Sequence, residues 1–232
     1  DRPTPRRPRP PATRLVIPDM PLRLTKPGLF VTATDTEVGK TVVTCAIAAW
    51  LRREGAKVGV CKPMASGCRH DREGLVNEDA EALAHFADCR ANLDVINPVR
   101  YRDPLAPAVA AERTERPVDD GAVAEALHRL DADHDVMLVE GIGGLLVPID
   151  EKRTVLDLAA ALGYPVLVVV RPTLGTLNHT AMTCELIRRR KLRLAGLVIN
   201  RYQPETTDLA ATTNRIWLAK QNRTSVLATV PE

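Results

Sequence analysis

The sequence predicts an α/β fold in which a mostly parallel central sheet carries helices on both faces. From residue 28 of the 232-residue chain, short apolar runs alternate with longer amphipathic runs, the pattern of strands and helices in such sheets. The polar motifs follow the apolar runs directly, and parallel strands bring their carboxyl ends to one edge, where ligands bind. The sequence therefore predicts one domain, residues 28–232, with a single composite site at that edge.

The first strand, a polar turn and the first helix together make a phosphate-binding loop. Residues 28–31 are an apolar run, residues 42–51 have helical character, and Gly39-Lys40-Thr41 stands directly before the helix. The N–H groups and the dipole of the helix N-terminus favour a phosphate there. Gly39 lets the backbone approach closely, Lys40 can reach the outer phosphates, and the Thr41 hydroxyl can ligate Mg²⁺. The predicted fold is therefore like that of the P-loop NTPases.

This loop departs from the strict pattern Gly-x-x-x-x-Gly-Lys-Thr, because Thr34 replaces the first glycine. Asp35 and Glu37 also place carboxylates beside the expected triphosphate, where like charges repel. The two carboxylates make better sense if the loop also faces a cation, such as Mg²⁺ or an amine substrate.

Further strands and helices follow in alternation. Strands are expected at residues 57–61, 135–139, 165–170, 194–199 and 225–230. Helices are expected at residues 77–87, 119–130, 155–162, 176–190 and 206–221. Asn77 is a suitable N-cap for the helix that it begins. Residues 88–117 are expected to be loop-rich, because they contain Pro98, Pro104 and Pro107.

Residues 1–27 differ in composition from the rest of the chain. They contain eight prolines, which exclude a helix or a central strand, so the segment is expected to be extended or disordered. Seven basic residues against two carboxylates give it a net charge of +5, which leaves −2 of the chain's +3 for the body. The body therefore offers no electrostatic case for binding nucleic acid. We interpret the segment as a passive extension and expect deletion of residues 1–26 to leave folding nearly unchanged.

The composition argues against two other classes of protein. No run approaches the roughly 18 apolar residues that span a membrane, and no segment resembles a secretory signal. The five cysteines form no Cys-x-x-Cys pair, so we expect reduced thiols in a cytoplasmic protein and no zinc site. His70, His85, His128 and His134 show no ligand spacing and are expected at the surface or as caps, and His179 is expected to be structural.

Several blocks of the sequence resemble the dethiobiotin synthetase family. Thr34-Asp-Thr-Glu-Val-Gly-Lys-Thr41 is similar to the family's variant loop Gly-Thr-Asp-Thr-x-Val-Gly-Lys-Thr, whose leading glycine falls at Ala33 here. If the backbone needs a positive φ there, the methyl group crowds the turn. The other blocks are Lys62-Pro-Met-Ala-Ser-Gly67, Asn77-Glu-Asp79, Asn97-Pro-Val-Arg-Tyr101, Pro104-Leu-Ala-Pro107, Glu140-Gly-Ile-Gly-Gly144 and Leu174-Gly-Thr-Leu-Asn-His179. Taken together, in order and at matching spacing over residues 28–232, these blocks are highly specific.

The resemblance implies an ATP-dependent cyclo-ligase of biotin biosynthesis. The family joins CO₂ to 7,8-diaminopelargonic acid (7,8-diaminononanoate) and closes a cyclic urea, which gives dethiobiotin, ADP and phosphate. It implies ATP as co-substrate, Mg²⁺ as cofactor, and a homodimer whose diamine pocket lies across the interface between protomers.

The resemblance also assigns roles to residues that follow the predicted strands. Lys62, Lys40 and Thr36 are the expected catalytic residues, because positive charge helps a reaction that accumulates negative charge. The oxygen donors for Mg²⁺ are expected to be Thr41, Asp79 and Glu140. The expected nucleotide ligands are Glu37, Val38, Gly39, Lys40, Thr41, Asp79, Glu140, Gly141, Ile142, Gly143, Asn200 and Arg201, with the Asn200 amide reading adenine. The expected substrate ligands are Thr36, Ser66, Leu174, Gly175 and Asn178.

Three other functional classes stay open. A related P-loop amidoligase shares the fold, but normally adds a glutamine amidotransferase domain for which this chain has no room. A nucleotide-dependent partitioning switch carries a signature lysine five residues before the P-loop lysine, where this chain has Asp35. A nucleotide-binding module without catalysis would bind ATP and release no phosphate. Taken alone, Asp79 could simply complement the dipole of its helix. Taken alone, Lys62 could be a solvated charge at the surface.

Overall fold

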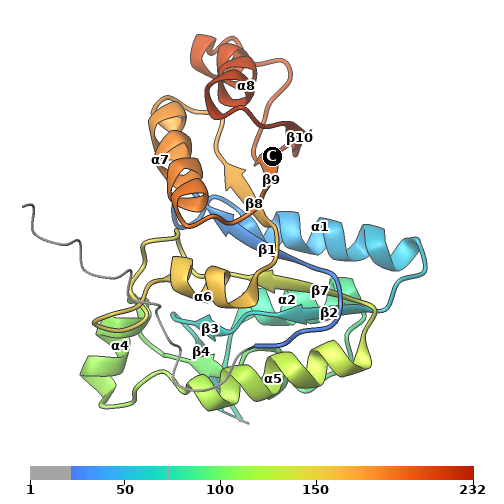
Figure 1. The fold of residues 1–232 in the computed structure, drawn as a ribbon, viewed down its shortest axis with the longest axis vertical. Coiled ribbons are helices and arrows are strands. Elements are labelled where there is room, and N and C mark those ends of the chain that lie inside the picture. The colour runs from blue at the N-terminus through green and yellow to red at the C-terminus, as the bar shows by residue number, and fades with distance from the viewer. Residues whose placement is uncertain (1–21, 73) are drawn as a thin grey trace, which may run out of the picture.

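The computed structural model describes residues 22–72 and 74–232, and it confirms an α/β fold built on a parallel sheet (Figure 1). Six strands lie in the order β10-β9-β8-β1-β7-β2, and each neighbouring pair is parallel. The strands are β1 (Gly28–Ala33), β2 (Val58–Cys61), β7 (Val136–Glu140), β8 (Val166–Val170), β9 (Leu194–Ile199) and β10 (Val226–Thr229). The central strands are almost wholly buried, because parallel sheets are covered on both faces.

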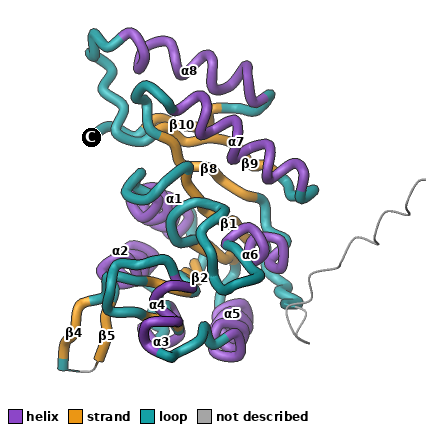
Figure 2. Tube along the Cα trace, turned by 90° about the vertical axis from the view of Figure 1, so that its left-hand side faces the viewer, coloured by secondary structure: helices purple, strands orange, loops and turns teal. Residues whose placement is uncertain are grey.

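Helices pack on both faces of this sheet, as Figure 2 shows. α1 (Lys40–Arg53) and α2 (Glu78–Ala87) lie together on one face, whereas α5 (Asp120–Asp133) and α6 (Val155–Leu162) cover the other. α7 (Thr176–Arg189) and α8 (Leu209–Asn222) pack against each other at the other end of the sheet, where α7 contacts β8 and β9 and α8 contacts β10. The loops after β1, β2, β7, β8 and β9 consequently meet at one edge.

Between β2 and α5 the structure contains short elements that the sequence did not predict. They are β3 (Met64–Ala65), β4 (Arg69–Asp71), β5 (Gly74–Val76), α3 (Leu93–Ile96), β6 (Val99–Arg100) and α4 (Pro107–Thr114). The prediction of a loop-rich segment at residues 88–117 was therefore wrong for its two helical stretches. α4 begins at Pro107, because proline costs no intrahelical hydrogen bond in the first turn of a helix. The other elements have two to four residues, too few for a period to show.

The long elements lie within a few residues of their predicted bounds. α1 begins at Lys40 rather than at residue 42, so the lysine of the phosphate-binding loop is the first helical residue. α8 begins at Leu209 rather than at residue 206, because Asp208 accepts a backbone N–H and caps the helix. Asn77 caps α2, as predicted from its residue type. These caps fix where the loops of the candidate site end.

Thiols and one imidazole are buried in the body of the protein. All five cysteines are free and buried. His134 is the C-cap of α5 and is also buried, with Nδ1 2.8 Å from the Leu130 carbonyl oxygen and Nε2 3.5 Å from Cys89 Sγ. Within the described residues, no helix combines the length and apolar character needed to cross a membrane.

Residues 22–27 are extended, but they are also attached to the body. The Asp131 carboxylate on α5 accepts hydrogen bonds from the Thr25 backbone N–H and hydroxyl, each at 2.8 Å, and from the Lys26 backbone N–H at 2.9 Å. Burial would raise the pKa of Asp131, but these backbone donors lower it below the usual value. Leu22 and Leu24 pack against the core. These contacts argue against the expectation that residues 22–26 can be removed without effect. The expectation for residues 1–21 concerns a part outside the described residues.

We expect deletion of residues 1–26 to lower the free energy of unfolding by about 1–3 kcal/mol, the cost of leaving a buried carboxylate without its donors. Deletion of residues 1–21 is the matched control, since it keeps Leu22, Thr25 and Lys26, and it should unfold like the full chain. Chemical denaturation of both truncated proteins measures the difference. Equal free energies of unfolding would show that the contacts to Asp131 contribute nothing.

Candidate active site

The phosphate-binding loop leads from β1 into α1 through two residues of left-handed conformation. Glu37 has φ 54° and Gly39 has φ 96°. Gly39 is the N-cap residue of α1, and no side chain caps the helix, which leaves its first N–H groups available for an anion. Ala33 is not among the positive-φ residues and is fully buried, so its methyl group packs in the core without crowding the turn. The departure from glycine at that position therefore creates no backbone strain.

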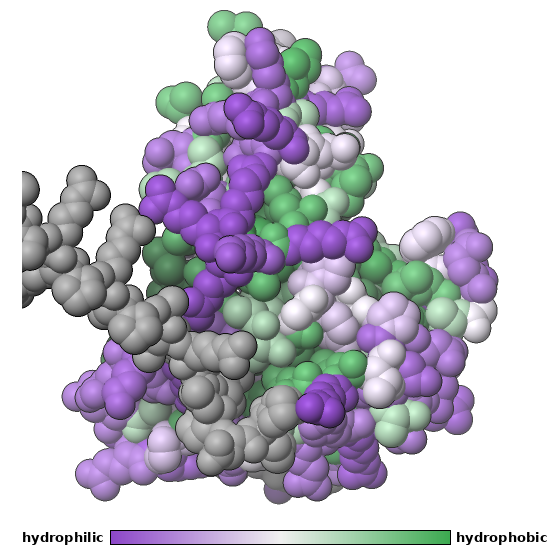
Figure 3. Space-filling view, in the orientation of Figure 1, coloured by the Kyte–Doolittle hydropathy of each residue, from purple (hydrophilic) through white to green (hydrophobic). Residues whose placement is uncertain are grey.

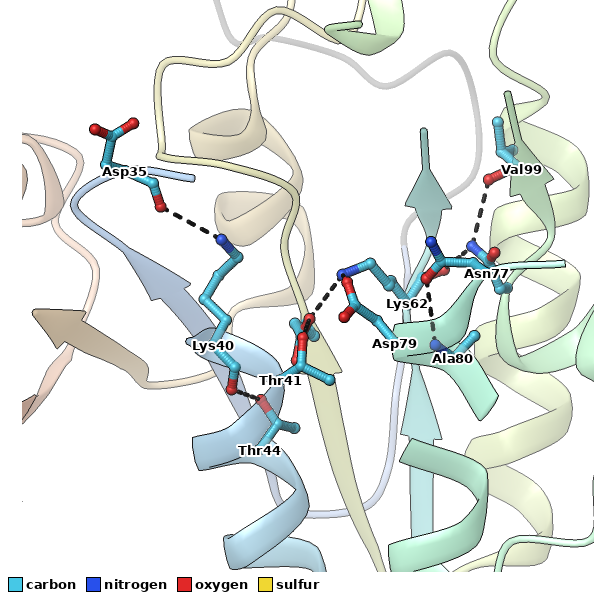
Figure 4. Close-up of polar contacts among 11 residues, drawn as sticks. Asp35, Lys40, Thr41, Thr44, Lys62, Asn77, Asp79, Ala80 and Val99 are labelled. Atoms are coloured by element: carbon cyan, nitrogen blue, oxygen red, sulfur yellow. Dashed lines mark hydrogen bonds and ion pairs between the residues drawn. The ribbon is translucent and has the colours of Figure 1, made fainter. Parts of the chain in front are cut away.

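The Lys40 side chain turns back toward the residues of the phosphate-binding loop. Its Nζ lies 3.5 Å from the Asp35 carbonyl oxygen, at the limit of a hydrogen bond (Figure 4). Burial lowers the pKa of Lys40, and the nearby charge of Lys62 lowers it further. Asp35 turns its carboxylate to the loop itself and accepts the Thr36 backbone N–H at 2.8 Å. An ammonium group so weakly paired is free to bind a phosphate.

The strongest polar cluster of the site surrounds Lys62. Its Nζ lies 2.7 Å from Asp79 Oδ2 and 2.7 Å from Glu140 Oε1, and the Thr41 hydroxyl donates to the same Glu140 oxygen at 2.9 Å. Lys62 follows β2, and Glu140 ends β7. Because β2 pairs with β7 in register up to Cys61 and Val139, the parallel sheet itself sets the two side chains together. Residues far apart in the chain therefore form one charged cluster.

Burial makes this cluster electrostatically unusual. Lys62 is 4% exposed and Glu140 is completely buried, whereas the Asp79 side chain is 44% exposed. Burial alone would lower the pKa of Lys62, but Glu140 and Asp79 together raise it above the usual value. Burial would raise the pKa of Asp79, and the Lys62 charge lowers it instead. The cluster is therefore charged, with two carboxylates around one ammonium.

The same cluster offers the oxygen donors that Mg²⁺ prefers. Glu140 Oε2 is buried and has no hydrogen-bond partner, which is costly for a carboxylate oxygen unless a cation or donor joins it. The Asp79 carboxylate and the Thr41 hydroxyl lie on the same cluster, and hard oxygen ligands with phosphates suit Mg²⁺. The residues present therefore fit a magnesium ion.

Asn200 lies beneath the phosphate-binding loop and is almost completely buried. Its Nδ2 donates to the Val38 carbonyl oxygen at 2.8 Å, and a Cβ added at Gly39 would come within 1.9 Å of that nitrogen. The sequence resemblance gave Asn200 only the role of reading adenine. In the structure its amide nitrogen is used to brace the loop, which also explains why no side chain fits at Gly39.

We expect Asn200→Ala to weaken binding of ATP, GTP and CTP alike by about tenfold, the equivalent of one good hydrogen bond. The loop loses its brace at Val38, and this loss does not depend on the base. Titration of the three nucleotides measures it, with Asn222→Ala as a control at a buried amide that donates to Leu218 instead. A loss confined to the preference for ATP would contradict the bracing role.

Two neighbouring cavities bring most of the predicted site residues together. One of about 460 Å³ is lined by Thr36, Glu37, Gly39, Lys40, Thr41, Val42, Lys62, Ser66, Asn77, Asp79, Ile142, Gly143 and Arg201. A second of about 490 Å³ shares Glu37 and Arg201 and is lined further by Arg171, Pro172, Thr173, Gln203, Thr206, Asp208, Ala211 and Glu232. The charged residues of the first cavity suit the phosphates of a nucleotide. The second cavity adjoins the first, so it would hold the nucleoside.

Three of the predicted substrate residues lie outside both cavities. Leu174, Gly175 and Asn178 stand at the exposed start of α7, and Leu174 is 89% exposed. Gly175, with φ 94°, is the N-cap residue of this helix. A single chain therefore does not bring these residues to the charged cluster.

Sequence reasoning gave no role to Arg171, although this residue follows β8 as the other motifs follow their strands. Its Nη2 donates to the Thr36 carbonyl oxygen at 3.0 Å, directly before the left-handed Glu37. Its Nε is buried without a partner. The position at a strand end was the available signal, and it placed Arg171 at the correct edge.

The chain has close relatives among known proteins. A family model described as an AAA domain matches residues 27–232. The chain is 45% identical over 204 residues to the ATP-dependent dethiobiotin synthetase of Anaeromyxobacter sp. strain K, which covers 88% of this chain and 89% of that protein. It is 40% identical over 196 residues to the protein of the same name from Thermodesulfovibrio yellowstonii, with 82% of each covered. The corresponding protein of Streptomyces avermitilis is 43% identical, over 88% of this chain and 83% of that protein.

Solved structures share the architecture at much lower identity. The MinC:MinD cell division protein complex of Aquifex aeolicus matches with a TM-score of 0.55 and 16% identity, over 89% of this chain and 81% of that chain. A ParA family ATPase from Chlorobium tepidum matches with a TM-score of 0.53 and 14% identity, over 90% and 85%. These likenesses support the fold alone, whereas the sequence relatives match along most of both chains. This chain belongs to the ATP-dependent dethiobiotin synthetase family.

Proposed function

We propose that this protein carboxylates 7,8-diaminopelargonic acid with CO₂ and closes the product to dethiobiotin, using ATP. The observation that carries the proposal is the cluster of Lys62, Asp79, Glu140 and Thr41 beside the phosphate-binding loop. The names of the relatives support the same activity. In this reaction one amine adds to CO₂ to form a carbamate and releases a proton. The carbamate oxygen attacks the γ-phosphorus and releases ADP, and the second amine then attacks the carbonyl carbon and releases phosphate.

The residues suit the charges of these steps. A carbamate and a triphosphate repel each other, so cationic groups at fixed positions lower the barrier. We expect Lys40 to bind the outer phosphates, and we expect Lys62, which lines the same cavity as Ser66, to act near the carbamate. Mg²⁺ held by Thr41, Asp79 and Glu140 would neutralise phosphate charge. Thr36 lines the same cavity, and we expect it to hold the substrate against the phosphates.

We propose further that the active form is a homodimer in the cytoplasm. Neither cavity includes Leu174, Gly175 or Asn178. A second protomer would therefore have to complete a binding site around these residues. Leu174 and Leu146 are exposed apolar side chains that an interface would cover. Figure 3 shows one face of the molecule, on which apolar residues gather toward the middle among hydrophilic ones.

Mass spectrometry of a reaction with the diamine, ¹³C-bicarbonate and Mg-ATP tests the activity. The expected product is dethiobiotin with ¹³C in the ureido carbon, formed with equal amounts of ADP and phosphate. Omitting the diamine should abolish phosphate release. Phosphate release that does not require the diamine would contradict the proposal and favour a nucleotide-dependent switch.

A further inference from the structure

Lys62 occupies the centre of the oxygen donors that would hold the magnesium ion. Its ammonium contacts Asp79 and Glu140 at 2.7 Å each, and the Thr41 hydroxyl shares the Glu140 oxygen. Two of the three expected metal ligands therefore contact the lysine nitrogen, and the third, Thr41, binds the Glu140 oxygen that the lysine also contacts. Figure 4 shows Lys62, Asp79 and Thr41 side by side. An ammonium and a metal ion cannot both lie between these carboxylates, because they compete for the same oxygens and repel each other.

The ion pair around Lys62 leaves one carboxylate oxygen without a hydrogen-bond partner. Glu140 Oε2 is fully buried and has no donor, although the ammonium touches the other oxygen of the same carboxylate. A buried pair that served only stability would be expected to satisfy each of its oxygens. A divalent ion beside phosphates would use an oxygen that the ammonium leaves unpaired.

The backbone of Lys62 is fixed, whereas its side chain has room to move. Its N–H donates to the Ile96 carbonyl oxygen at 2.7 Å, and its carbonyl accepts from Asn97 Nδ2 at 2.6 Å. Asn97 is itself buried. The side chain, in contrast, lines the cavity of about 460 Å³ that also holds Lys40 and Ser66. A four-carbon stem with rotatable bonds can therefore turn the ammonium into this cavity without moving β2.

We propose that Lys62 is the resident cation of the nucleotide-free enzyme and is exchanged for Mg²⁺ only when a nucleotide binds. This inference rests on the proposed function and adds an order of events to it. Without nucleotide, the ammonium blocks the carboxylates, and Lys40 nearby adds further repulsion against a free divalent ion. The phosphates of ATP bring the negative charge that draws both cations. Mg²⁺ then takes the carboxylates, and the released Lys62 ammonium turns toward the cavity where the substrate reacts.

Binding of Mn²⁺ in the absence of nucleotide, followed by electron paramagnetic resonance, tests the exchange. The wild type should bind Mn²⁺ weakly, and Lys62→Met should bind it at least about tenfold more tightly, because a buried positive charge has been removed from the carboxylates. Lys62→Arg, which keeps a cation, should show no such gain. Arg69→Met is the matched control, since it breaks an exposed ion pair with Glu81 outside the cluster. Equal Mn²⁺ affinities of the wild type and Lys62→Met would overturn the proposal.

Crystal structures of the wild type provide a second test that does not depend on how the variants fold. Without nucleotide the Lys62–Asp79 and Lys62–Glu140 contacts should be present, and with Mg²⁺ and a non-hydrolysable ATP analogue a metal ion should replace the ammonium. Retention of both contacts in that complex would overturn the exchange. Neither test uses dethiobiotin formation. Loss of the exchange in an enzyme that still makes dethiobiotin would therefore leave the proposed function intact.

Discussion

Replacing Lys62 by alanine is expected to lower turnover about 100- to 1,000-fold and to leave Mg-ATP binding at least as tight as in the wild type. The negative charge that the ammonium meets is largest when the carbamate attacks the γ-phosphate, so its effect belongs to the transition state. Lys62 contacts Asp79 and Glu140 rather than the start of α1, where we propose that the phosphates bind. Single-turnover kinetics and nucleotide titration separate the two effects.

Two other variants make this experiment specific. Lys62→Arg should recover only part of the turnover, because the guanidinium is planar and larger than an ammonium and cannot take the same position at the reacting groups. Lys40→Ala should impair both nucleotide binding and turnover, since Lys40 belongs to the phosphate-binding loop. If Lys62→Ala kept more than about a third of wild-type turnover at saturating substrates, the loss would be too small for a transition-state contact.

Replacing Glu140 by alanine is expected to destabilise the nucleotide-free protein by about 3–5 kcal/mol, the cost of breaking a buried ion pair from one side. Glu140 is completely buried at the end of β7, and its removal leaves the buried Lys62 with Asp79 as its carboxylate partner. Since Asp79 is near the surface, water reaches it and weakens what it contributes. Urea denaturation measures the change in the free energy of unfolding.

Asp79→Ala is the matched control, because Asp79 contacts the same ammonium at the same distance. With 44% of its side chain exposed, its loss should cost only about 1 kcal/mol or less of stability. Both variants should lose turnover, because each removes an expected Mg²⁺ ligand, so stability alone distinguishes them. Similar destabilisation of the two variants would show that burial does not set the strength of the pair.

The position of the site could be predicted from the sequence, because its residues directly follow the apolar runs that indicate strands. The apolar run before Gly39-Lys40-Thr41, the run before Lys62 and the run before Glu140 each indicate a strand. Once the sheet is parallel, these ends must share an edge. The short elements between residues 62 and 114 could not be predicted in the same way, because two to four residues carry no period and Pro107 suggests a break where a helix begins.

The attachment of residues 22–27 gave no signal in the sequence. Residues 22–27 hold only one proline and directly continue a segment that holds seven. The carboxylate that anchors them is Asp131, more than a hundred residues away. Hydrophobic periodicity reports which face of an element is buried. It does not report which distant backbone group meets a buried carboxylate.

The sequence by itself determined the fold class, the phosphate-binding loop and the set of polar residues at one edge of the sheet. These follow from local chemistry: apolar periods, glycine where φ is positive, and hard oxygen donors after buried strands. Only the tertiary structure decided that Lys62 pairs with Asp79 and Glu140 and that Asn200 braces Val38. Those pairings depend on the order of strands in space, with β1 between β7 and β8 and β2 beside β7. Because that order arises from packing the whole chain, it brings together groups that lie 78 and 162 residues apart in the sequence.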